Sequence, residues 1–353
     1  MRKALRCLIP FVSLALWFSA VMAADIERPR NIILVGWDGA QRDHVKECFQ
    51  RGELPTLKRL ADEGAWLDVE VKGTTDTKAG WTEILTGYGP AITGVYSNGR
   101  YRAAPKGLSI FERLEEHFGP DKFVTVAVIG KKTHCGEINP PKKARLDAED
   151  EAPPAQDKGK GRKGGARAGA AAKAKGEIVE ENGVKYRVFG GSPYYHMHFA
   201  LDVWDFGLIQ DPRVGTRTIE LLEKYKDKPF FFFVHFAEVD IKGHKHGENS
   251  KEYNDQLISN DTWTGKILEK LKELKLDDQT LVYVTADHGF DEGLKSHRRA
   301  PHVFLVTNDK KVVQGGAPAT RADVPVTIMD RFGLDVAKYN PPLTGKSLLK
   351  AAN

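Results

Sequence analysis

Cysteine is scarce in this sequence of 353 residues, which contains only Cys7, Cys48 and Cys135. Cys7 lies in a segment that we expect to be removed, so a dense disulfide scaffold is excluded. In an oxidising compartment Cys48 and Cys135 can pair, and two free thiols are the alternative. Two cysteines do not define a scaffold, so the sequence leaves this pairing open.

Long apolar runs are missing except at the N-terminus, where one extends from about residue 8 to residue 21. Basic residues precede this run, and small residues of the kind that signal peptidase reads end it at Ala23. The run is shorter than the roughly 20 residues that a membrane span needs. We therefore predict a signal peptide at residues 1–23, with an uncleaved anchor as the alternative. The mature protein is then periplasmic or extracellular, with no membrane span.

The expected mature chain also lacks a strong charge of either sign. Loss of the signal peptide lowers the net charge from +5 to +2, and the stretch from Pro141 to Lys175 alone carries +5. The remainder is close to −3, so the pI of 8.8 does not indicate a nucleic-acid partner. Residues 140–176 are rich in Lys, Gly, Ala and Pro, with almost nothing to bury. We predict a disordered insertion there, and a basic tail that docks on an anionic surface is the alternative.

The rest of the chain alternates between two patterns and shows no internal repeat. Near-continuous apolar runs of the kind found in sheets covered on both faces predict strands at 31–35, 123–129, 230–236, 281–285 and 302–307. Apolar residues at three- and four-residue spacing predict helices at 55–63, 108–118, 214–225 and 252–274. This alternation predicts one catalytic domain at 24–353. Its fold class is an α/β three-layer sandwich with a mostly parallel central sheet.

Polar residues that can carry chemistry follow several of these strands. Asp38 comes directly after the first strand, where ligands gather in open α/β sheets, although many Asp-Gly pairs are only turns. Thr77 lies in a turn before a helix-like stretch that ends at Thr86-Gly87. Its hydroxyl can face a ligand beside the helix N-terminus, or it can simply cap the helix.

Further along, Asp240 and His244 form an Asp-x-x-x-His pair, whose members share a face if the segment is helical. Carboxylate and imidazole suit zinc or manganese. His246 is a competing ligand, and an exposed polar loop is the plain alternative. Asp287-His288-Gly289 follows another strand, with Gly289 permitting a sharp turn. His297 precedes the next strand, and His302 begins it.

Without the alternatives His246 and His302, these residues amount to three carboxylates, three imidazoles and one hydroxyl at four strand ends. That inventory divides into two sites of about three protein ligands each, the form of catalytic zinc sites. Two ions roughly 4 Å apart can clamp the attacking and leaving oxygens of an in-line displacement. We therefore expect two divalent metal ions. Zinc is the first candidate for their identity, and manganese is the second.

In this order the motifs resemble the alkaline phosphatase superfamily, and within it the type I phosphodiesterase/nucleotide pyrophosphatase branch. The resemblance covers residues 31–98 and 230–349. It implies that Asp38, Thr77, Asp287 and His288 hold one metal and that Asp240, His244 and His297 hold the other. The last ligand in this family is a His before a proline and a strand, best matched by His297, with His302 as the alternative. The nucleophile precedes a Thr-Gly by nine positions, which is Thr77 here.

The resemblance also implies a function: hydrolysis of a small phosphoric ester through a phosphothreonine on Thr77. A phosphodiesterase or nucleotide pyrophosphatase is expected first, a phosphomonoesterase second, and an inactive metal-binding relative last. Asn98 belongs to a matched family motif and is expected near the substrate. The branch often has Asn three residues after the nucleophile, where this chain has Gly80, so Lys78 or backbone N–H groups must bind the phosphoryl oxygens instead. A formylglycine sulfatase is not expected, because Thr77 is neither Cys nor Ser.

Overall fold

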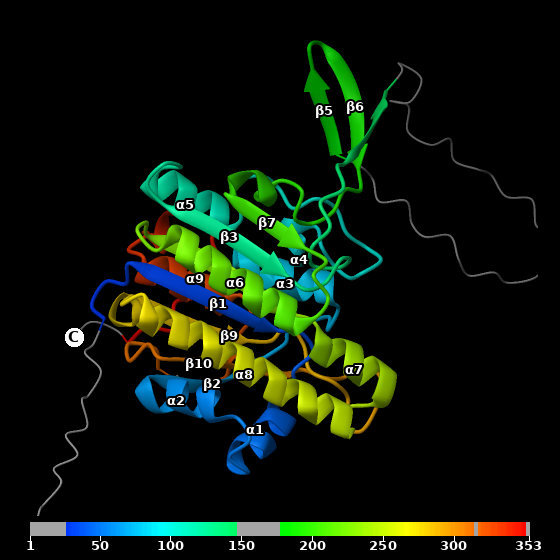
Figure 1. Ribbon diagram of the computed structural model, residues 1–353. Helices are drawn as coiled ribbons and strands as arrows, with labels where there is room; N and C mark the ends of the chain where they lie inside the picture. Colours follow the sequence, from blue (N-terminus) through cyan, green and yellow to red (C-terminus); the bar gives the residue numbers. More distant parts are fainter. Residues whose placement is uncertain (1–25, 147–176, 314–316, 351–353) are drawn as a thin grey trace, which may run out of the picture.

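The computed structural model of the protein describes residues 26–146, 177–313 and 317–350 (Figure 1). The predicted signal peptide and residues 147–176 of the predicted insertion lie outside the described residues. None of the helices in the described ranges combines the length and the apolar character that crossing a bilayer requires.

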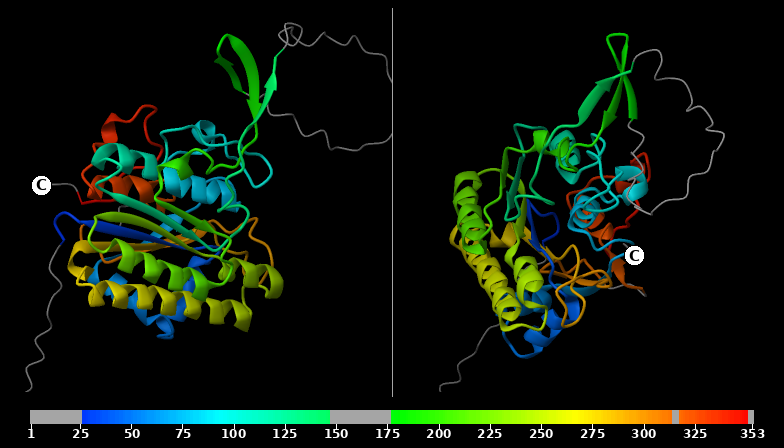
Figure 2. Two further views of the ribbon diagram at one scale, coloured as in Figure 1. Left: turned by 45° about the horizontal axis from the view of Figure 1, so that its top comes forward. Right: turned by 90° about the vertical axis from the view of Figure 1, so that its right-hand side faces the viewer.

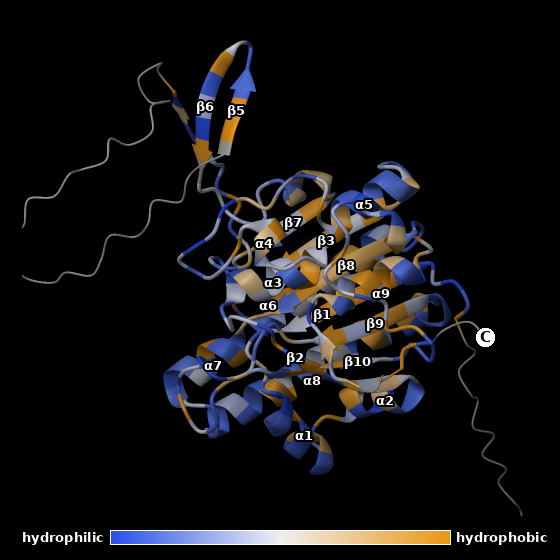
Figure 3. Ribbon diagram, turned by 180° about the vertical axis from the view of Figure 1, so that it is seen from behind, coloured by the Kyte–Doolittle hydropathy of each residue, from blue (hydrophilic) through white to orange (hydrophobic). Residues whose placement is uncertain are grey.

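A sheet of eight strands forms the centre of the molecule, in the order β11-β2-β10-β9-β1-β8-β3-β7. Its middle strands run parallel, whereas β10 is antiparallel to both of its neighbours. The strands are β1 (Asn31–Trp37), β2 (Ala65–Glu70), β3 (Val124–Ile129), β7 (Val203–Phe206), β8 (Phe230–Phe236), β9 (Thr280–Thr285), β10 (His302–Thr307) and β11 (Ala319–Thr320). Every residue of β1, β3, β8 and β9 is buried, which explains their apolar sequences (Figure 3).

Helices cover both faces of this sheet (Figure 2). One layer contains α1 (Arg42–Gln50), α2 (Pro55–Glu63), α6 (Asp211–Tyr225) and α8 (Lys251–Glu273), with α7 (Glu238–His246) at its end. The other contains α3 (Thr77–Thr86), α5 (Ile110–Phe118) and α9 (Asp323–Arg331), with the short α4 (Pro90–Thr93) nearby. The predicted three-layer α/β fold is thus confirmed, and each predicted strand and helix is present with bounds shifted by only a few residues.

A second sheet projects from the body as an arm (Figure 1). It contains β4 (Lys142–Arg145), β6 (Val184–Phe189) and β5 (Glu177–Glu181), which pair antiparallel in that order. The prediction of disorder was therefore wrong for Lys142–Arg145. The exposed β4 has no apolar pattern, and it forms because its backbone pairs with β6.

Cys48 and Cys135 are both buried, and neither forms a disulfide. Cys48 lies in α1, and Cys135 follows β3. The structure therefore has the two free thiols that the sequence left as one of two alternatives.

Candidate active site

The strands β1, β3, β8 and β9 run parallel, so their carboxyl ends lie together at one end of the central sheet. A polar residue follows each end within a few positions. These residues are Asp38 after β1, Lys131 after β3, Asp240 after β8 and Asp287 after β9. Open α/β sheets bind their ligands beyond this end. The fold thus brings together residues that lie far apart in the chain.

Thr77 is the first residue of α3, and Asp76 takes the N-cap position. The Oγ1 atom of Thr77 lies 3.3 Å from Nε2 of His288, and Nζ of Lys131 donates to it at 3.2 Å. Thr77 is therefore not the N-cap residue, and its buried hydroxyl is directed into the site. Because a helix N-terminus carries a positive partial charge, this position suits an oxygen that becomes anionic.

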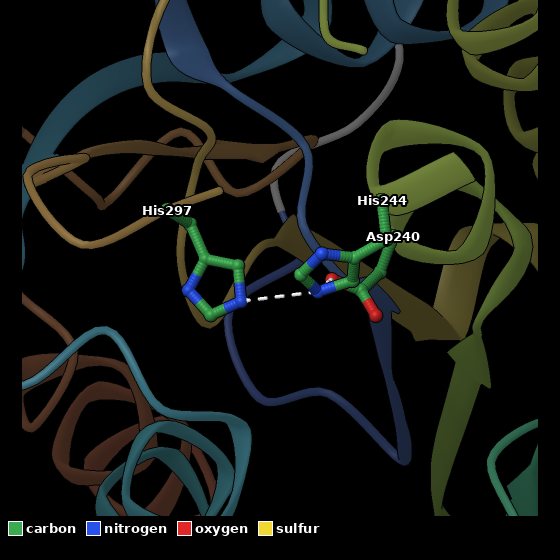
Figure 4. A group of neighbouring side chains, drawn as sticks. All are labelled: Asp240, His244 and His297. Atoms are coloured by element: carbon green, nitrogen blue, oxygen red, sulfur yellow. Dashed lines mark hydrogen bonds and ion pairs between the residues drawn. The ribbon is translucent and has the colours of Figure 1, made fainter. Parts of the chain in front are cut away.

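Asp240, His244 and His297 offer ligand atoms that all lie within 4.8 Å of one another. Figure 4 shows ring nitrogens of His244 and His297 facing each other, with Asp240 beside them. The two Nε2 atoms are 3.2 Å apart. Asp240 and His244 lie one turn apart on α7, so they share one face. The carbonyl oxygen of Lys295 lies 2.9 Å from Nδ1 of His244, which directs Nε2 into the group.

Asp38, Asp240 and His288 form a second group with the same spacing, so Asp240 reaches both groups. Nε2 of His288 lies 3.7 Å from Asp38 Oδ1 and 3.5 Å from Asp287 Oδ2. The His288 and His297 rings stack with their centroids 4.0 Å apart, which joins the two groups. The six Asp and His ligands of the first-choice set therefore lie in one cluster around Thr77.

Two other histidines that the sequence offered as ligands lie elsewhere. Nδ1 of His302 lies 2.9 Å from a carboxylate oxygen of Glu70, on the neighbouring strand β2. His246 lies at the end of α7 and faces Glu252 at 3.5 Å. The structure therefore places His297, and not His302 or His246, beside His244.

Two residues of the site were missed by sequence reasoning. Nζ of Lys131 lies 2.7 Å from Asp38 Oδ1 and 2.8 Å from Asp240 Oδ2, with only 11% of its side chain exposed. Nε2 of His235 lies 2.9 Å from the other oxygen of Asp38. Weak signals existed, because Lys131 follows a predicted strand and His235 interrupts the apolar run of β8. Their contacts with Asp38 depend on β3, β8 and β1 lying side by side.

Three buried carboxylates thus share the cluster with one lysine. Burial works to raise the pKa of Asp38, but Lys131 holds it below its usual range. Burial and the neighbouring Asp38 raise the pKa of Asp287 far above its usual range. In the described part of the chain, no hydrogen-bond donor reaches Oδ2 of Asp287.

Two histidines of the cluster, His288 and His297, are suited to act as neutral ligands, whereas the hydrogen bond to Asp240 raises the pKa of the third, His244. Burial and the neighbouring His288 lower the pKa of His297 to about 4, so this imidazole is neutral at neutral pH. Burial also lowers the pKa of His288. Neutral imidazoles beside a buried carboxylate that lacks a donor fit divalent cations.

The three residues that the sequence proposes for substrate binding have other contacts in the structure. Nζ of Lys78 pairs with Glu137 and lies 3.5 Å from the centroid of the Tyr101 ring. The backbone N–H of Lys78 donates to Oδ1 of Asn98 at 2.9 Å, which ties the Asn98 loop to the start of α3. The N–H of Gly80 donates to the carbonyl oxygen of Asp76, the residue before α3, at 3.0 Å. These contacts stabilise the surroundings of Thr77.

Gly80 is also a point of close packing. A Cβ atom there would lie 2.8 Å from the Cβ of Asp287 and 2.9 Å from Nη1 of Arg321. Arg321 donates to the Asp287 carbonyl at 2.9 Å and to Glu83 of α3 at 2.8 Å. A longer side chain at position 80 would displace Asp287, so the absence of a donor at this position follows from the packing.

The sequence profile of the family described as type I phosphodiesterase/nucleotide pyrophosphatase matches residues 32–331. Ectonucleotide pyrophosphatase/phosphodiesterase family member 1 of Mus musculus is 30% identical over 158 residues, 43% of this chain and 16% of that protein. Phosphopentomutase of Carboxydothermus hydrogenoformans is 36% identical over 125 residues, 34% of this chain and 30% of that protein. The matched segments thus cover less than a third of these curated relatives.

Solved structures share the fold. A protein in the alkaline phosphatase superfamily from Vibrio parahaemolyticus has a TM-score of 0.57 at 15% identity, covering 94% of this chain and 72% of that chain. Alkaline phosphatase PafA has a TM-score of 0.57 at 13% identity, covering 88% of this chain and 97% of that chain. At such identities the likeness establishes the fold and leaves the substrate open.

Proposed function

We propose that this chain, which belongs to the type I phosphodiesterase/nucleotide pyrophosphatase family, is a hydrolase of phosphoric esters with Thr77 as its nucleophile. The observation that supports this best is the position of Thr77 Oγ1, 3.3 Å from His288 Nε2 in a cluster of Asp and His side chains. A hydroxyl is a weak nucleophile near neutral pH, so it needs the activation that such a cluster provides.

The residues fit two divalent ions, with zinc as the first candidate and manganese as the second. Asp240, His244 and His297 would hold one ion. Asp38, Asp287 and His288 would hold the other beside Thr77, with Asp240 able to reach both. When bound, the ions would lower the pKa of the Thr77 hydroxyl and stabilise charge on the leaving oxygen.

In the proposed reaction, Oγ1 of Thr77 attacks phosphorus in line with the ester bond. Oγ1 gives up its proton to solvent and bonds to phosphorus as the ester P–O bond breaks, and the released oxygen takes up a proton from solvent. Water then attacks the phosphothreonine, which releases the phosphoryl group and restores the hydroxyl. Positioning and electrostatics supply most of the rate in such reactions.

The direct test is substitution of the nucleophile. Thr77→Ala should lower kcat on bis-p-nitrophenyl phosphate by at least about 10³-fold, because the attacking oxygen is gone. Its zinc content should stay near that of the unmodified protein, and Thr77→Ser should retain part of the activity. A near-normal rate for Thr77→Ala would remove this residue from the mechanism.

Metal removal is the second test. Treatment with a chelator should abolish activity, and Zn²⁺ should restore it, because the ions carry the activation of Thr77. Metal analysis of the purified protein gives the identity and number of the ions. Activity that survives complete chelation would contradict the two-ion proposal.

The family match favours diesters and pyrophosphates, but one observation favours monoesters as a second candidate. Lys131 adds a buried cation 3.2 Å from the nucleophile. A phosphomonoester dianion carries one more negative charge than a diester, so an added cation favours the monoester. Comparing kcat/KM for p-nitrophenyl phosphate, bis-p-nitrophenyl phosphate and p-nitrophenyl sulfate separates these candidates from each other and from a sulfatase.

We also propose export to the periplasm or the extracellular space, which is supported by the N-terminal pattern that ends at Ala23. Expression in a bacterial host followed by N-terminal sequencing tests this. A mature protein that begins at Ala24 in the periplasmic fraction is expected. A full-length protein in the cytoplasm would contradict the proposal.

A further inference from the structure

The loop between β9 and β10 carries His297. This loop is hydrogen-bonded to Glu248, a residue that the proposed mechanism does not use. Glu248 lies between α7 and α8 and is almost fully buried. Its Oε2 accepts the backbone N–H of Gly293 at 2.9 Å, and its own N–H donates to the carbonyl of Leu294 at 3.0 Å. Glu248 therefore binds this loop through both its side chain and its backbone.

The other carboxylate oxygen of Glu248 pairs with His44 of α1. The distance from Nδ1 of His44 to Oε1 of Glu248 is 2.7 Å, and the two side chains are only 8% and 2% exposed. Burial works to lower the pKa of His44, but its contacts with Cys48 and Glu248 raise it to about 10. The pair is thus a buried imidazolium and carboxylate at neutral pH.

A short path of contacts links this pair to the group formed by Asp240, His244 and His297. Leu294, which Glu248 holds, is followed by Lys295, whose carbonyl oxygen lies 2.9 Å from Nδ1 of His244. His297 comes two residues later. Both imidazoles of this group therefore depend on the segment that Glu248 fixes.

The other group has different support. Asp38 is held by Lys131 and by His235 of β8. The backbone carbonyl of Asp287 accepts from Arg321. None of these contacts passes through Glu248.

We propose that the buried ion pair of His44 and Glu248 positions His244 and His297, and so sets the affinity of the group with Asp240 for its divalent ion. The inference rests on the proposed two-ion function and adds positioning residues that touch neither ion. Partners in the outer shell of a metal site typically change its affinity by about 10- to 100-fold. The effect should fall on one of the two ions only.

The test is a titration of the metal-free full-length protein with Zn²⁺ against a chromophoric chelator. Glu248→Gln keeps the shape of the side chain but removes its charge, and one acceptor oxygen becomes a donor. We expect the Zn²⁺ affinity of the group with Asp240, His244 and His297 to fall by about 10- to 100-fold. The affinity for the other Zn²⁺ ion should stay unchanged, whichever of the two ions binds more tightly. The Zn²⁺ concentration for half-maximal activity should rise by the same factor, with activity recovered at saturating Zn²⁺.

His44→Gln breaks the same pair from the other side and should give the same selective loss. The double variant should be no worse than either single variant, because the two residues act as one unit. If Glu248→Gln does not fold, His44→Gln carries the test alone.

A matched control is Asp309→Asn, which breaks another buried ion pair. Oδ2 of Asp309 lies 2.7 Å from Nε of Arg331, with side chains 1% and 4% exposed. Asp309 follows β10, which runs antiparallel to β9. It therefore lies at the other end of the sheet from the candidate active site. This variant should be less stable but should bind both ions normally.

The outcomes separate the inference from the function on which it rests. Unchanged Zn²⁺ affinities in Glu248→Gln and His44→Gln, or an equal weakening of both ions, would overturn the positioning role. An unmodified protein that binds no divalent ion would instead overturn the proposed function.

Discussion

Lys131 occupies the centre of the site at the scale of single residues. Its ammonium lies within 2.8 Å of Asp38 and Asp240, and Asp287 adds a third carboxylate nearby. Burial works to lower the pKa of Lys131, but the carboxylates of Asp240 and Asp38 raise it above its usual value. Without divalent ions, Lys131 is therefore the cation that holds these acids together.

This role predicts that Lys131→Met lowers the stability of the metal-free protein more than that of the metal-bound protein. In the presence of a chelator, we expect the free energy of unfolding to fall by about 3 kcal/mol, because removing one partner leaves buried charge unpaired. With saturating Zn²⁺ the loss should be much smaller, and Zn²⁺ should bind more tightly because no ammonium competes for the carboxylates. Urea unfolding with and without the chelator measures both effects. Equal destabilisation under the two conditions would mean that Lys131 contributes packing only.

At the scale of elements, Asp211 joins the start of α6 to the start of α7. Its Oδ1 accepts the N–H of Ala237 at 3.2 Å, and Gln256 of α8 donates to its Oδ2 at 2.6 Å. Burial and the nearby Glu238 raise the pKa of Asp211 to about 7. The carboxyl is therefore largely protonated in the folded protein at slightly acidic pH.

The sign of the resulting pH dependence follows from proton binding. Between the unfolded pKa of 3.8 and the folded pKa of about 7, the folded state holds a proton that the unfolded state has lost. The contribution of Asp211 to the free energy of unfolding therefore falls as pH rises through this window, by up to about 1.4 kcal/mol per pH unit.

Asp211→Asn should remove this contribution, so its stability relative to the unmodified protein should be greater at pH 8 than at pH 4. Thermal unfolding across this range is the measurement. A constant difference between the two proteins at all pH values would show that folding does not shift the pKa of Asp211.

The elements predicted from the sequence were those with a strong local signal. The strands β1, β3, β8, β9 and β10 are nearly continuous apolar runs because both faces of the sheet are covered. The strands β2 and β7 were not predicted. They lie toward the edges of the sheet, and their partly exposed residues give no such run.

The same distinction applies to the site. Asp38, Asp240 and Asp287 could be proposed because each follows a strand end in an ordered motif. The ion pair of Lys131 with Asp38 and the path from His44 to His244 could not, because they arise from side chains that meet only after the layers pack. Local sequence patterns therefore identify candidate ligands. The residues that position these ligands can be identified only from the tertiary structure.

At the scale of the whole molecule, the arm formed by β4, β5 and β6 is separate from the sheet that positions the site. The arm strands pair with one another in a sheet of their own. The chain enters and leaves the arm at adjacent points, because Ser192 donates its backbone N–H to the Asn139 carbonyl at 2.8 Å. The side-chain oxygen of Ser192 also accepts the N–H of Asn139 at 3.0 Å. These two hydrogen bonds hold the chain segments at the base of the arm together without any contact from the arm strands.

The body should therefore fold without the arm. Replacement of residues 142–189 by two glycines keeps Asn139 and Ser192 as well as the bond from Ala103 to the Gly190 carbonyl. We expect the free energy of unfolding to stay within about 0.5 kcal/mol, because none of the removed residues that the structure describes is buried. Zn²⁺ binding and turnover of small aryl phosphates should also be unchanged, since every proposed ligand lies elsewhere. Loss of turnover on larger esters alone would assign substrate selection to the arm, whereas loss of folding or of Zn²⁺ would show that the body depends on it.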